Sequence, residues 1–370
     1  MSKVIVGLSG GVDSAVAAYL LKKAGHEVIG VMLRTWSSLE DDRTDDGTYV
    51  EQNKCCEIDD ARDVAYKLGI EFYPYNCVKE FADKVIEPFV NEYTLGRTPN
   101  PCIECNRYVK FEKLLYLADV LKADHIATGH YARLIQLPNG RYTVQKSGAL
   151  GKDQTYMLYK LSQDQLKRII FPLGELNKEK VREIAKEAGI PVADKKDSQE
   201  ICFIPDDDYA GYIRRHKNAG KPEDTISDFE KEGDFIDKTG KILGTHKGII
   251  HYTIGQRKGL NLAMGHPVYV TGIRPDENKV VIGEEEDLYS SVVYIRDYNF
   301  LSIPGLGPNE NVTGTVKIRY HHPGEKALIE KIDDDRLKLT FTNPVKSATP
   351  GQSAVFYDDN GCVIGGGIID

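Results

Sequence analysis

A glycine-rich turn near the start of the chain constrains the possible folds more than any other stretch. The apolar run Val4–Val6 predicts a buried strand, and the apolar spacing over residues 15–24 predicts a helix. Between them lies Gly7–Ser14, in which Gly10 and Gly11 leave room for backbone amides to approach an anion. The N-terminus of the helix adds about half a positive charge. The turn therefore predicts a phosphate-binding loop, against the simpler alternative of an ordinary strand–helix turn.

The loop differs from the two commonest nucleotide-binding turns. No Gly-Lys-Ser/Thr follows it, as a P-loop requires, and the third glycine of a dinucleotide fingerprint is missing. Strand and helix patterns then alternate along the first half of the chain, which predicts an α/β fold with a doubly wound parallel sheet. Ligands of such sheets bind at the carboxyl ends of the strands. The loop is expected at one of these ends.

The pattern changes beyond Pro205, where short strands and glycine turns replace most of the helices. Runs such as Lys247–Thr253 predict the strands of a small β-rich central domain. From about Ser290 onward, evenly spaced β-branched strands predict a C-terminal antiparallel β-barrel. We expect three domains, over residues 1–207, 208–288 and 289–370.

Composition leaves a nucleic-acid partner open and argues against a membrane protein. The net charge is −8, but phosphates respond to local basic patches such as Arg257-Lys258 rather than to the total. No stretch approaches 18 consecutive apolar residues, and the N-terminus has no basic segment followed by an apolar one. We expect a soluble cytoplasmic protein without a membrane partner.

The seven cysteines are unevenly spaced, which argues against a framework of structural disulfides. Cys102 and Cys105 form a Cys-x-x-Cys pair inside Gly96–Arg107, whose glycine and two prolines predict a stiff exposed loop. Such a pair can bind a metal or act as a redox couple, and it can also be accidental. A third candidate, Cys202, follows about a hundred residues later. The other cysteines are expected to be structural or incidental: Cys55, Cys56, Cys77 and Cys362.

Several motifs taken together closely resemble the tRNA-specific 2-thiouridylases, a family of the PP-loop ATP pyrophosphatase superfamily. The matching stretches are Ser9–Ser14, Thr98–Asn106, Ala127–Arg133, Lys152–Tyr156, Asp197–Pro205, Gly255–Leu260, Gly314–His322 and Thr349–Gln352. The resemblance implies an adenine nucleotide alpha hydrolase-like first domain. It also implies an enzyme that uses ATP to replace the C2 oxygen of the wobble uridine of tRNA with sulfur. ATP is needed because this oxygen is a poor leaving group until it departs as part of AMP.

The resemblance assigns an ATP site residue by residue. The phosphates are expected to bind the loop, and the nucleotide is expected to lie against backbone groups of Leu33 and Gly129. Mg²⁺ is expected to offset the phosphate charge, with Asp13 as its candidate partner. The ATP-binding residues expected in the loop are Gly7, Leu8, Ser9, Gly10, Gly11, Val12, Asp13 and Ser14.

The sulfur chemistry that the resemblance implies leaves two mechanisms open. In the first, Cys202 carries a persulfide, Cys105 is the nucleophile, and the two end each turnover as a disulfide that a reductant opens. Thiolates need electropositive surroundings, and Arg107 is a candidate to provide them. The chain departs from the commoner family pattern at Cys102, where aspartate is expected. In the second mechanism Cys102, Cys105 and Cys202 therefore hold a [4Fe-4S] cluster that carries hydrosulfide; we favour the first.

The resemblance also implies contacts with tRNA. Asn100, Pro101 and Cys102 are expected to line the pocket for the target base. The other expected tRNA contacts are His130, Lys152, Asp153, Gln154, Arg319, Tyr320 and Gln352. The expected partners are the wobble-uridine tRNAs for Lys, Glu and Gln, and a sulfur donor, which is a cysteine desulfurase, a sulfur relay protein or hydrosulfide. Two other functions stay open: a different PP-loop adenylating synthetase, and a redox or metal-binding module.

Cys102→Asp separates the two sulfur mechanisms. Under the persulfide route the variant retains thiolation activity, because aspartate is the commoner residue at this position. If Cys102 is a cluster ligand, the variant loses activity with the cluster. The measurement is the 2-thiouridine content of tRNA after incubation with ATP and a sulfur donor. Cys105→Ser and Cys202→Ser are expected to be inactive under both mechanisms, so full activity in either would contradict both.

Overall fold

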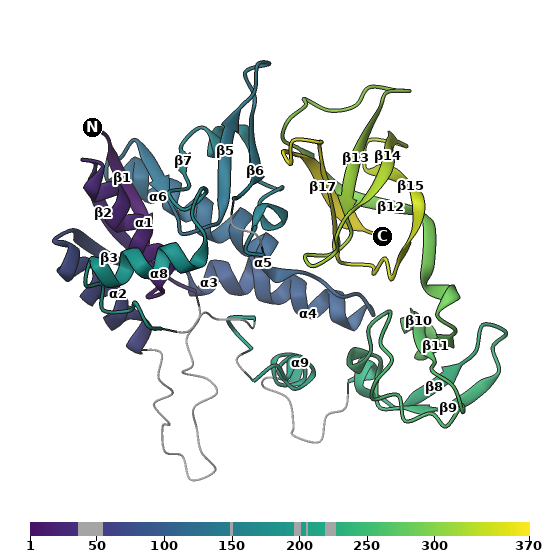
Figure 1. The fold of residues 1–370 in the computed structure, drawn as a ribbon. Coiled ribbons are helices and arrows are strands. Elements are labelled where there is room, and N and C mark those ends of the chain that lie inside the picture. The colour runs from purple at the N-terminus through teal and green to yellow at the C-terminus, as the bar shows by residue number, and fades with distance from the viewer. Residues whose placement is uncertain (36–54, 149–150, 196–200, 205, 219–226) are drawn as a thin grey trace, which may run out of the picture.

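The computed structural model describes residues 1–35, 55–148, 151–195, 201–204, 206–218 and 227–370 (Figure 1). Within these residues the strands form a parallel sheet, a smaller mixed sheet, a closed barrel and one separate hairpin. Most of the Asp197–Pro205 motif and the side chains of Cys55 and Cys56 lie outside the described part of the chain. None of the described helices is long and apolar enough to cross a membrane.

The first part of the chain forms a five-stranded parallel sheet in the order β3-β2-β1-β4-β7, which confirms the doubly wound α/β prediction (Figure 1). Its strands are β1 (Lys3–Gly7), β2 (Glu27–Arg34), β3 (Glu71–Asn76), β4 (His125–Ala127) and β7 (Ile169–Ile170). The helices packed on it are α1 (Val12–Lys23), α2 (Cys55–Leu68), α6 (Phe111–Val120) and α8 (Lys178–Glu187). Alternate residues of β1 face opposite layers: Val4 and Val6 pack with α1, α2 and α8, while Ile5 packs with α6.

The strand order reverses between β1 and β4, because β2 and β3 lie on one side of β1 and β4 and β7 on the other. Open α/β sheets bind ligands in the crevice outside such a reversal. The loop after β1 and the Thr128–His130 segment after β4 both begin at this point. The topology therefore brings two sequence-predicted segments, far apart in the chain, to one edge of the sheet.

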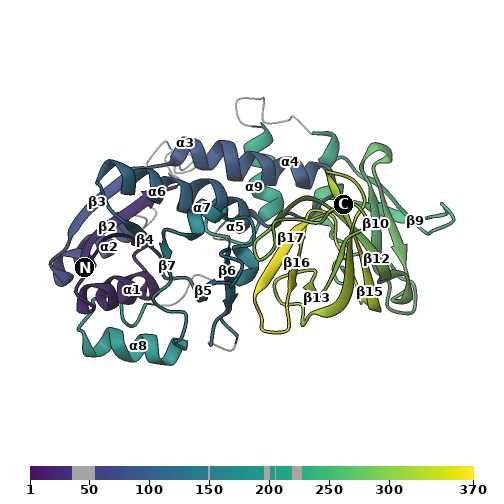
Figure 2. The same ribbon diagram turned by 90° about the horizontal axis from the view of Figure 1, so that it is seen from above.

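A helical rod leads from the parallel sheet toward the rest of the molecule, and Figure 1 and Figure 2 show it from two directions. It consists of α3 (Val78–Phe81), a π-helical stretch (Ala82–Ile86) and α4 (Glu87–Thr94). A second helical stretch follows as α5 (Pro101–Glu104), the π-helical Cys105–Lys110 and then α6. The remaining elements of this half are the hairpin β5 (Ala132–Gln136) and β6 (Tyr142–Lys146), and the short α7 (Gln163–Leu166).

The second half contains the mixed sheet and the barrel. The mixed sheet has the order β10-β11-β8-β9, with β8 (Gly233–Ile236), β9 (Ile242–His246), β10 (Tyr269–Arg274) and β11 (Lys279–Gly283). The closed antiparallel barrel confirms the prediction for the C-terminal region. Its strands are β12 (Tyr289–Phe300), β13 (Asn311–Lys317), β14 (Glu325–Lys331), β15 (Arg336–Lys346), β16 (Ser353–Tyr357) and β17 (Val363–Ile369).

One expectation for the central region is wrong, and one helix there was not predicted. The predicted strand Lys247–Thr253 contains a single 3₁₀ turn at Ile249–His251, whose apolar residues are buried without pairing in a sheet. A helix that the sequence pattern did not reveal, α9 (Tyr209–Asn218), precedes the mixed sheet. Its buried positions Ala210, Gly211 and Ile213 are too few and too small to produce a clear helical period.

Glycines in β17 let the barrel pack closely against the first half of the chain. A Cβ atom at Gly366 would lie 2.8 Å from Cδ2 of Tyr159 and 2.9 Å from the Ala354 carbonyl oxygen. Tyr159 is fully buried, and its hydroxyl is 3.0 Å from Oγ of Ser353 on β16. The tyrosine thus fills the space that the missing side chain leaves, and joins the two parts of the molecule.

Gly366→Ala is expected to destabilise the protein by about 1–3 kcal/mol, because the added methyl group displaces Tyr159 in a filled core. Thermal unfolding followed by circular dichroism measures the change as a lower Tm. Gly272→Ala in β10 is the matched control, since a Cβ there meets only the Val281 side chain, at ordinary distances of 3.5 Å and 3.6 Å. Equal Tm values for the two variants would contradict this account of the interface.

Candidate active site

The loop after β1 is held in shape by its own serines. The Ser9 amide donates to Oγ of Ser14 at 3.1 Å, and Ser14 Oγ donates to the Gly11 carbonyl at 3.0 Å. Gly10 has a φ of 71°, a left-handed conformation that glycine adopts without strain. Gly11 is the N-cap of α1 and carries no side chain to cap it. The first amides of α1 are therefore left for an anion, as a phosphate-binding loop requires.

Asp13, in the first turn of α1, is engaged by two donors. Lys178 Nζ lies 2.8 Å and 2.9 Å from its two carboxylate oxygens, and the Tyr131 hydroxyl donates to Oδ1 at 2.7 Å. Lys178 is the first residue of α8 and is largely buried. A carboxylate oxygen is a ligand that suits Mg²⁺, but a cation at Asp13 would compete with the lysine. The structure thus adds a charged residue that the sequence reasoning missed.

A second lysine reaches the same loop. Lys195 Nζ donates to the Gly10 carbonyl at 3.1 Å and pairs with Asp60 of α2 at 2.6 Å. Neither Lys195 nor Lys178 has a motif around it, and only the packing of α8 and its C-terminal extension brings both ammonium groups to the loop.

The expected nucleotide contacts Gly129 and Leu33 lie at the carboxyl ends of their strands. A Cβ atom at Gly129 would be 2.7 Å from backbone atoms of both Asp13 and Ser14, so only glycine allows this approach. Leu33, near the end of β2, is half-buried and packs beside Tyr75. Val31 and Met32, which precede it in β2, are buried, so Leu33 is the residue at which the end of the strand becomes accessible to solvent.

The predicted loop Gly96–Arg107 is non-helical only as far as Asn100, and the prediction is wrong from Pro101 onward, where the segment with the Cys-x-x-Cys pair is helical. The Asn100 side chain caps α5 by accepting from the Cys102 amide at 3.2 Å, and Pro101 occupies the first helical position. An Asn-Pro pair is a helix-start signal as well as a turn signal, which is why the sequence was misread here. Pro101 and Cys105 are buried, whereas Cys102 is exposed.

Cys202 is anchored by the aromatic residue that follows it, which packs on α3 and α4. Phe203 packs edge-on against Phe81 and Phe89, at centroid distances of 5.6 Å and 5.3 Å. Phe203 and Cys105 belong to the same buried cluster, while Cys202 itself is exposed. None of the cysteines whose side chains the structure describes forms a disulfide. Across the same residues, no group of three or more His, Cys, Asp or Glu side chains is arranged to hold a metal ion.

The charge that faces the thiols comes from Lys110. Burial raises the pKa of the Cys105 thiol to about 12, and the Lys110 ammonium opposes that rise. Although burial acts against its charge, the pKa of Lys110 is raised by the nearby thiols of Cys105, Cys102 and Cys202. Arg107 was the expected contributor, but its guanidinium lies 3.5 Å from the Asp297 carboxylate.

The π-helix explains why Lys110 was missed. Five residues of α-helix turn the chain by 500°, which would separate Cys105 and Lys110 by about 140° around the axis. In a π-helix the backbone bonds i→i+5, so residues five apart lie nearly one above the other. The Phe111 amide closes this pattern by donating to the Asn106 carbonyl. No signal in the sequence announces this local widening.

His130 also lies close to the Lys110 ammonium. Its Nδ1 is 2.8 Å from the Thr128 hydroxyl, and its ring stacks on Phe111 at a centroid distance of 5.6 Å. Burial first, and then the Lys110 ammonium, lower the pKa of His130 to about 3. The imidazole is therefore neutral over the whole physiological range of pH.

Two of the expected tRNA-binding residues after the hairpin make local hydrogen bonds. Asp153 accepts from the Thr155 hydroxyl at 2.8 Å. The Gln154 side chain accepts from the Tyr131 amide at 2.9 Å, which fixes the segment that also holds Asp13. Lys152 is half-buried beside them.

The expected tRNA-binding residues of the barrel lie at two places. Arg319 is exposed and donates to the Lys346 carbonyl at 3.0 Å, and Tyr320 meets Tyr156 edge-on at 6.1 Å. Gln352 donates to the Thr98 carbonyl at 2.8 Å, four residues before Cys102. Gln352 thus joins the barrel to the chain that leads into α5.

Lys110→Met is expected to slow alkylation of Cys105 by iodoacetamide. Loss of the ammonium removes the charge that favours the thiolate, and a tenfold slower reaction corresponds to about 1.4 kcal/mol of lost thiolate stabilisation. Peptide mass spectrometry at one alkaline pH measures the rate for Cys105 separately from the other thiols. Lys110→Arg keeps the charge and serves as the control; equal rates in the Met and Arg variants would contradict an electrostatic role.

Three domain families match in series along the chain. The tRNA methyl transferase HUP domain covers residues 2–206, the tRNA methyl transferase PRC-barrel domain 226–284, and the aminomethyltransferase beta-barrel domain 290–369. Among solved structures, the U34-tRNA thiolase NcsA from Methanococcus maripaludis with its [4Fe-4S] cluster matches with a TM-score of 0.34 and 20% identity, over 59% of this chain and 67% of that one. That likeness is too weak to bear on the chemistry of this chain.

Curated relatives match over the full length. The tRNA-specific 2-thiouridylase MnmA of Lachnoclostridium phytofermentans is 49% identical over 373 residues, covering 100% of this chain and 99% of the relative. The tRNA-specific 2-thiouridylase MnmA of Clostridium acetobutylicum is 48% identical over 371 residues, covering 99% of each. With this degree of identity along its whole length, the chain belongs to the tRNA-specific 2-thiouridylases, a family of tRNA sulfurtransferases.

Proposed function

We propose that this protein adenylates the C2 oxygen of the wobble uridine in tRNA and replaces that oxygen with sulfur from a persulfide on Cys202. The observation that carries the proposal is the grouping of Cys105, Cys102 and Cys202 around Lys110. Family membership and the phosphate-binding loop at the sheet reversal support the ATP-dependent half.

In the activating step the uracil O2 attacks the α-phosphorus of ATP, and pyrophosphate leaves. The amides of Gly7–Ser14 would bind the phosphates, and the ammonium groups of Lys178 and Lys195 lie close enough to the loop to offset their charge. Leu33 and Gly129 would border the nucleotide. When bound beside Asp13, Mg²⁺ would neutralise further phosphate charge.

In the sulfur step the terminal sulfur of the Cys202 persulfide attacks C2, and AMP leaves with the former C2 oxygen. The Cys105 thiolate then attacks the Cys202 sulfur, which breaks the sulfur–sulfur bond and releases 2-thiouridine. A Cys105–Cys202 disulfide remains, and a reductant returns both thiols. Two electrons from that reductant balance each turnover.

The cluster mechanism receives no support from the donor set. The thiols of Cys102, Cys105 and Cys202 affect one another electrostatically, but the described side chains do not converge as metal ligands do. The proposed sulfur route therefore runs through the persulfide alone.

The tRNA-binding residues are assigned from their positions in the motifs of the family. We propose that Asn100, Pro101 and Cys102 line the pocket for the uracil, and that Arg319 and Tyr320 of the barrel contact the tRNA. The remaining proposed contacts are His130, Lys152, Asp153, Gln154 and Gln352. The substrate would be a wobble-uridine tRNA for Lys, Glu or Gln, and a cysteine desulfurase or a relay protein would load Cys202. We also propose that the functional units follow the boundaries 1–207, 208–288 and 289–370.

The proposal is tested by incubating the protein with ATP, Mg²⁺, a sulfur donor and unmodified tRNA. Nucleoside mass spectrometry is expected to detect 2-thiouridine, with one AMP formed for each thiolated base. Ser9→Ala combined with Asp13→Ala is expected to abolish AMP formation and to retain tRNA binding, because these residues belong to the phosphate loop. Failure of the wild-type protein to form 2-thiouridine with a competent donor would overturn the proposed function.

The sulfur route is tested by the metal content. Protein purified anaerobically is expected to be fully active without iron or acid-labile sulfide. Activity that tracks the iron content would replace the persulfide route by the cluster route, while the overall thiolation reaction would stand.

A further inference from the structure

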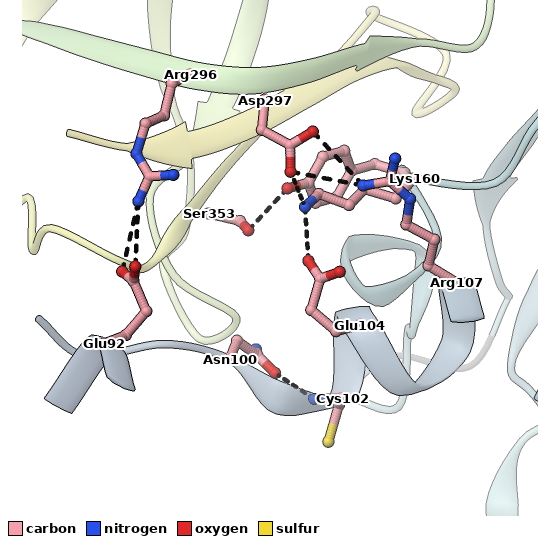
Figure 3. A network of polar contacts seen from close by, with 10 residues as sticks. Glu92, Asn100, Cys102, Glu104, Arg107, Lys160, Arg296, Asp297 and Ser353 are labelled. Carbon is pink, nitrogen blue, oxygen red and sulfur yellow. Dashed lines mark hydrogen bonds and ion pairs between the residues drawn. The ribbon is translucent and has the colours of Figure 1, made fainter. Parts of the chain in front are cut away.

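A buried lysine links the cysteine-bearing helix to the barrel (Figure 3). Lys160 Nζ lies 2.6 Å from Oε1 of Glu104 on α5 and 2.6 Å from Oδ2 of Asp297 on β12. The Lys160 side chain is only 3% exposed. Glu104 stands between Cys102 and Cys105 in the Cys-x-x-Cys pair, so the ammonium holds the stretch of helix that carries the thiols.

The barrel is locally distorted where it supplies the second carboxylate. The register of β12 against β17 shifts between Arg296 and Asn299, and Asp297 within that bulge has a left-handed φ of 44°. A non-glycine residue adopts this conformation at a cost that the surroundings must offset, and β-bulges re-aim side chains. Here the bulge directs the Asp297 carboxylate to Lys160 and Arg107 (Figure 3).

The four charges of the network balance. Lys160 and Arg107 supply two positive charges, and Glu104 and Asp297 supply two negative ones. The Lys160 ammonium is the buried member of the network, whereas the Asp297 side chain is 46% exposed. Removing a carboxylate partner is costly, because it leaves the lysine charge less well compensated in a poorly solvated place. The network therefore favours one position of α5 relative to the barrel.

A second ion pair also joins the barrel to this helical part of the chain. Arg296, the neighbour of Asp297, lies 3.4 Å from the Glu92 carboxylate on α4 (Figure 3). Between the two bridges, the Thr98 amide donates to the Pro350 carbonyl of the barrel at 2.8 Å. The chain from α4 to α5 is thus fastened to the barrel before, within and after the loop that joins the two helices.

We propose that Lys160 is a positioning residue for sulfur transfer, which holds the thiol-bearing helix in register with the barrel through Glu104 and Asp297. The inference rests on the proposed function, in which the tRNA docks on the barrel and its base meets the thiols at α5. Without the bridge, the adenylated base and the thiols are no longer held at a fixed separation. Water then hydrolyses the adenylated uridine back to uridine and AMP, and ATP is consumed without thiolation.

Lys160→Met and Asp297→Asn test the proposal through the number of AMP molecules formed per 2-thiouridine. We expect this ratio to rise about tenfold in both variants, from near one in the wild type, with the KM for ATP unchanged. Asparagine tolerates the left-handed conformation of residue 297, so this variant removes the charge and leaves the bulge in place. A variant that merely folds less completely lowers AMP and 2-thiouridine together and leaves the ratio unchanged.

Lys113→Met is the matched control. Lys113 pairs with Glu80 at 2.9 Å, and this bridge joins α6 to α3 without involving the barrel. The control is expected to keep the wild-type ratio. Ratios in Lys160→Met and Asp297→Asn that equal that of the control would overturn the positioning role, whatever the total rates.

Hydrogen exchange provides a readout that does not depend on activity. Amides of residues 101–110 are expected to exchange faster in Lys160→Met and Asp297→Asn, while those of α8 stay unchanged. Unchanged exchange at 101–110 would overturn the inference on structural grounds. A wild-type protein that forms no 2-thiouridine would instead overturn the proposed function. The role of the Lys160 ion pairs in sulfur transfer would then be overturned as well.

Discussion

The ion pairs of the buried Lys160 ammonium connect the helix that carries Cys102 and Cys105 to the barrel. The two carboxylate partners come from residues 193 positions apart in the chain, one inside the Cys-x-x-Cys stretch and one in the first strand of the barrel. Nearby contacts are of other kinds: Tyr159 packs against the Gly366 backbone, and Gln352 bonds to Thr98. Together they make the position of α5 a property of the barrel as much as of the parallel sheet.

The proposed ATP-binding loop after β1 is held by different means. Its shape comes from local serine hydrogen bonds, and its charge environment from Lys178 and Lys195, which arrive from the far end of the same domain. Gly129 brings the end of β4 against the first turn of α1. The residue after Gly129 is His130, which lies close to the Lys110 ammonium, as the cysteines do. A short stretch after β4 therefore borders both parts of the site.

The large-scale fold could be predicted because it follows from periodic patterns. Alternating strands and helices give the parallel sheet, and evenly spaced β-branched runs give the barrel. The errors arose where a local interaction outweighs the pattern. Asn100 and Pro101 start a helix in a stretch rich in turn residues, and the π-helix moves Lys110 to the face of Cys105. The ion pairs of Lys160 could not be predicted from the sequence. Glu104 and Asp297 are far apart in the chain and come together only where the folded barrel packs on α5.

The contrast between the two thiols gives the proposed sulfur route a direction. Cys202 is exposed, whereas Cys105 is 6% exposed, and burial keeps its thiol protonated unless the charge of Lys110 prevails. A protein that donates sulfur can reach only an exposed thiol, so access favours Cys202, like the exposed Cys102, over the buried Cys105 for the loading step that we propose. In the proposed route Cys105 is shielded from the donor and meets the persulfide only when Cys202 approaches it. Burial lowers the thiolate fraction of Cys105, and the Lys110 ammonium opposes that effect, so the proposed loading and resolving steps would take place at thiols that differ in access.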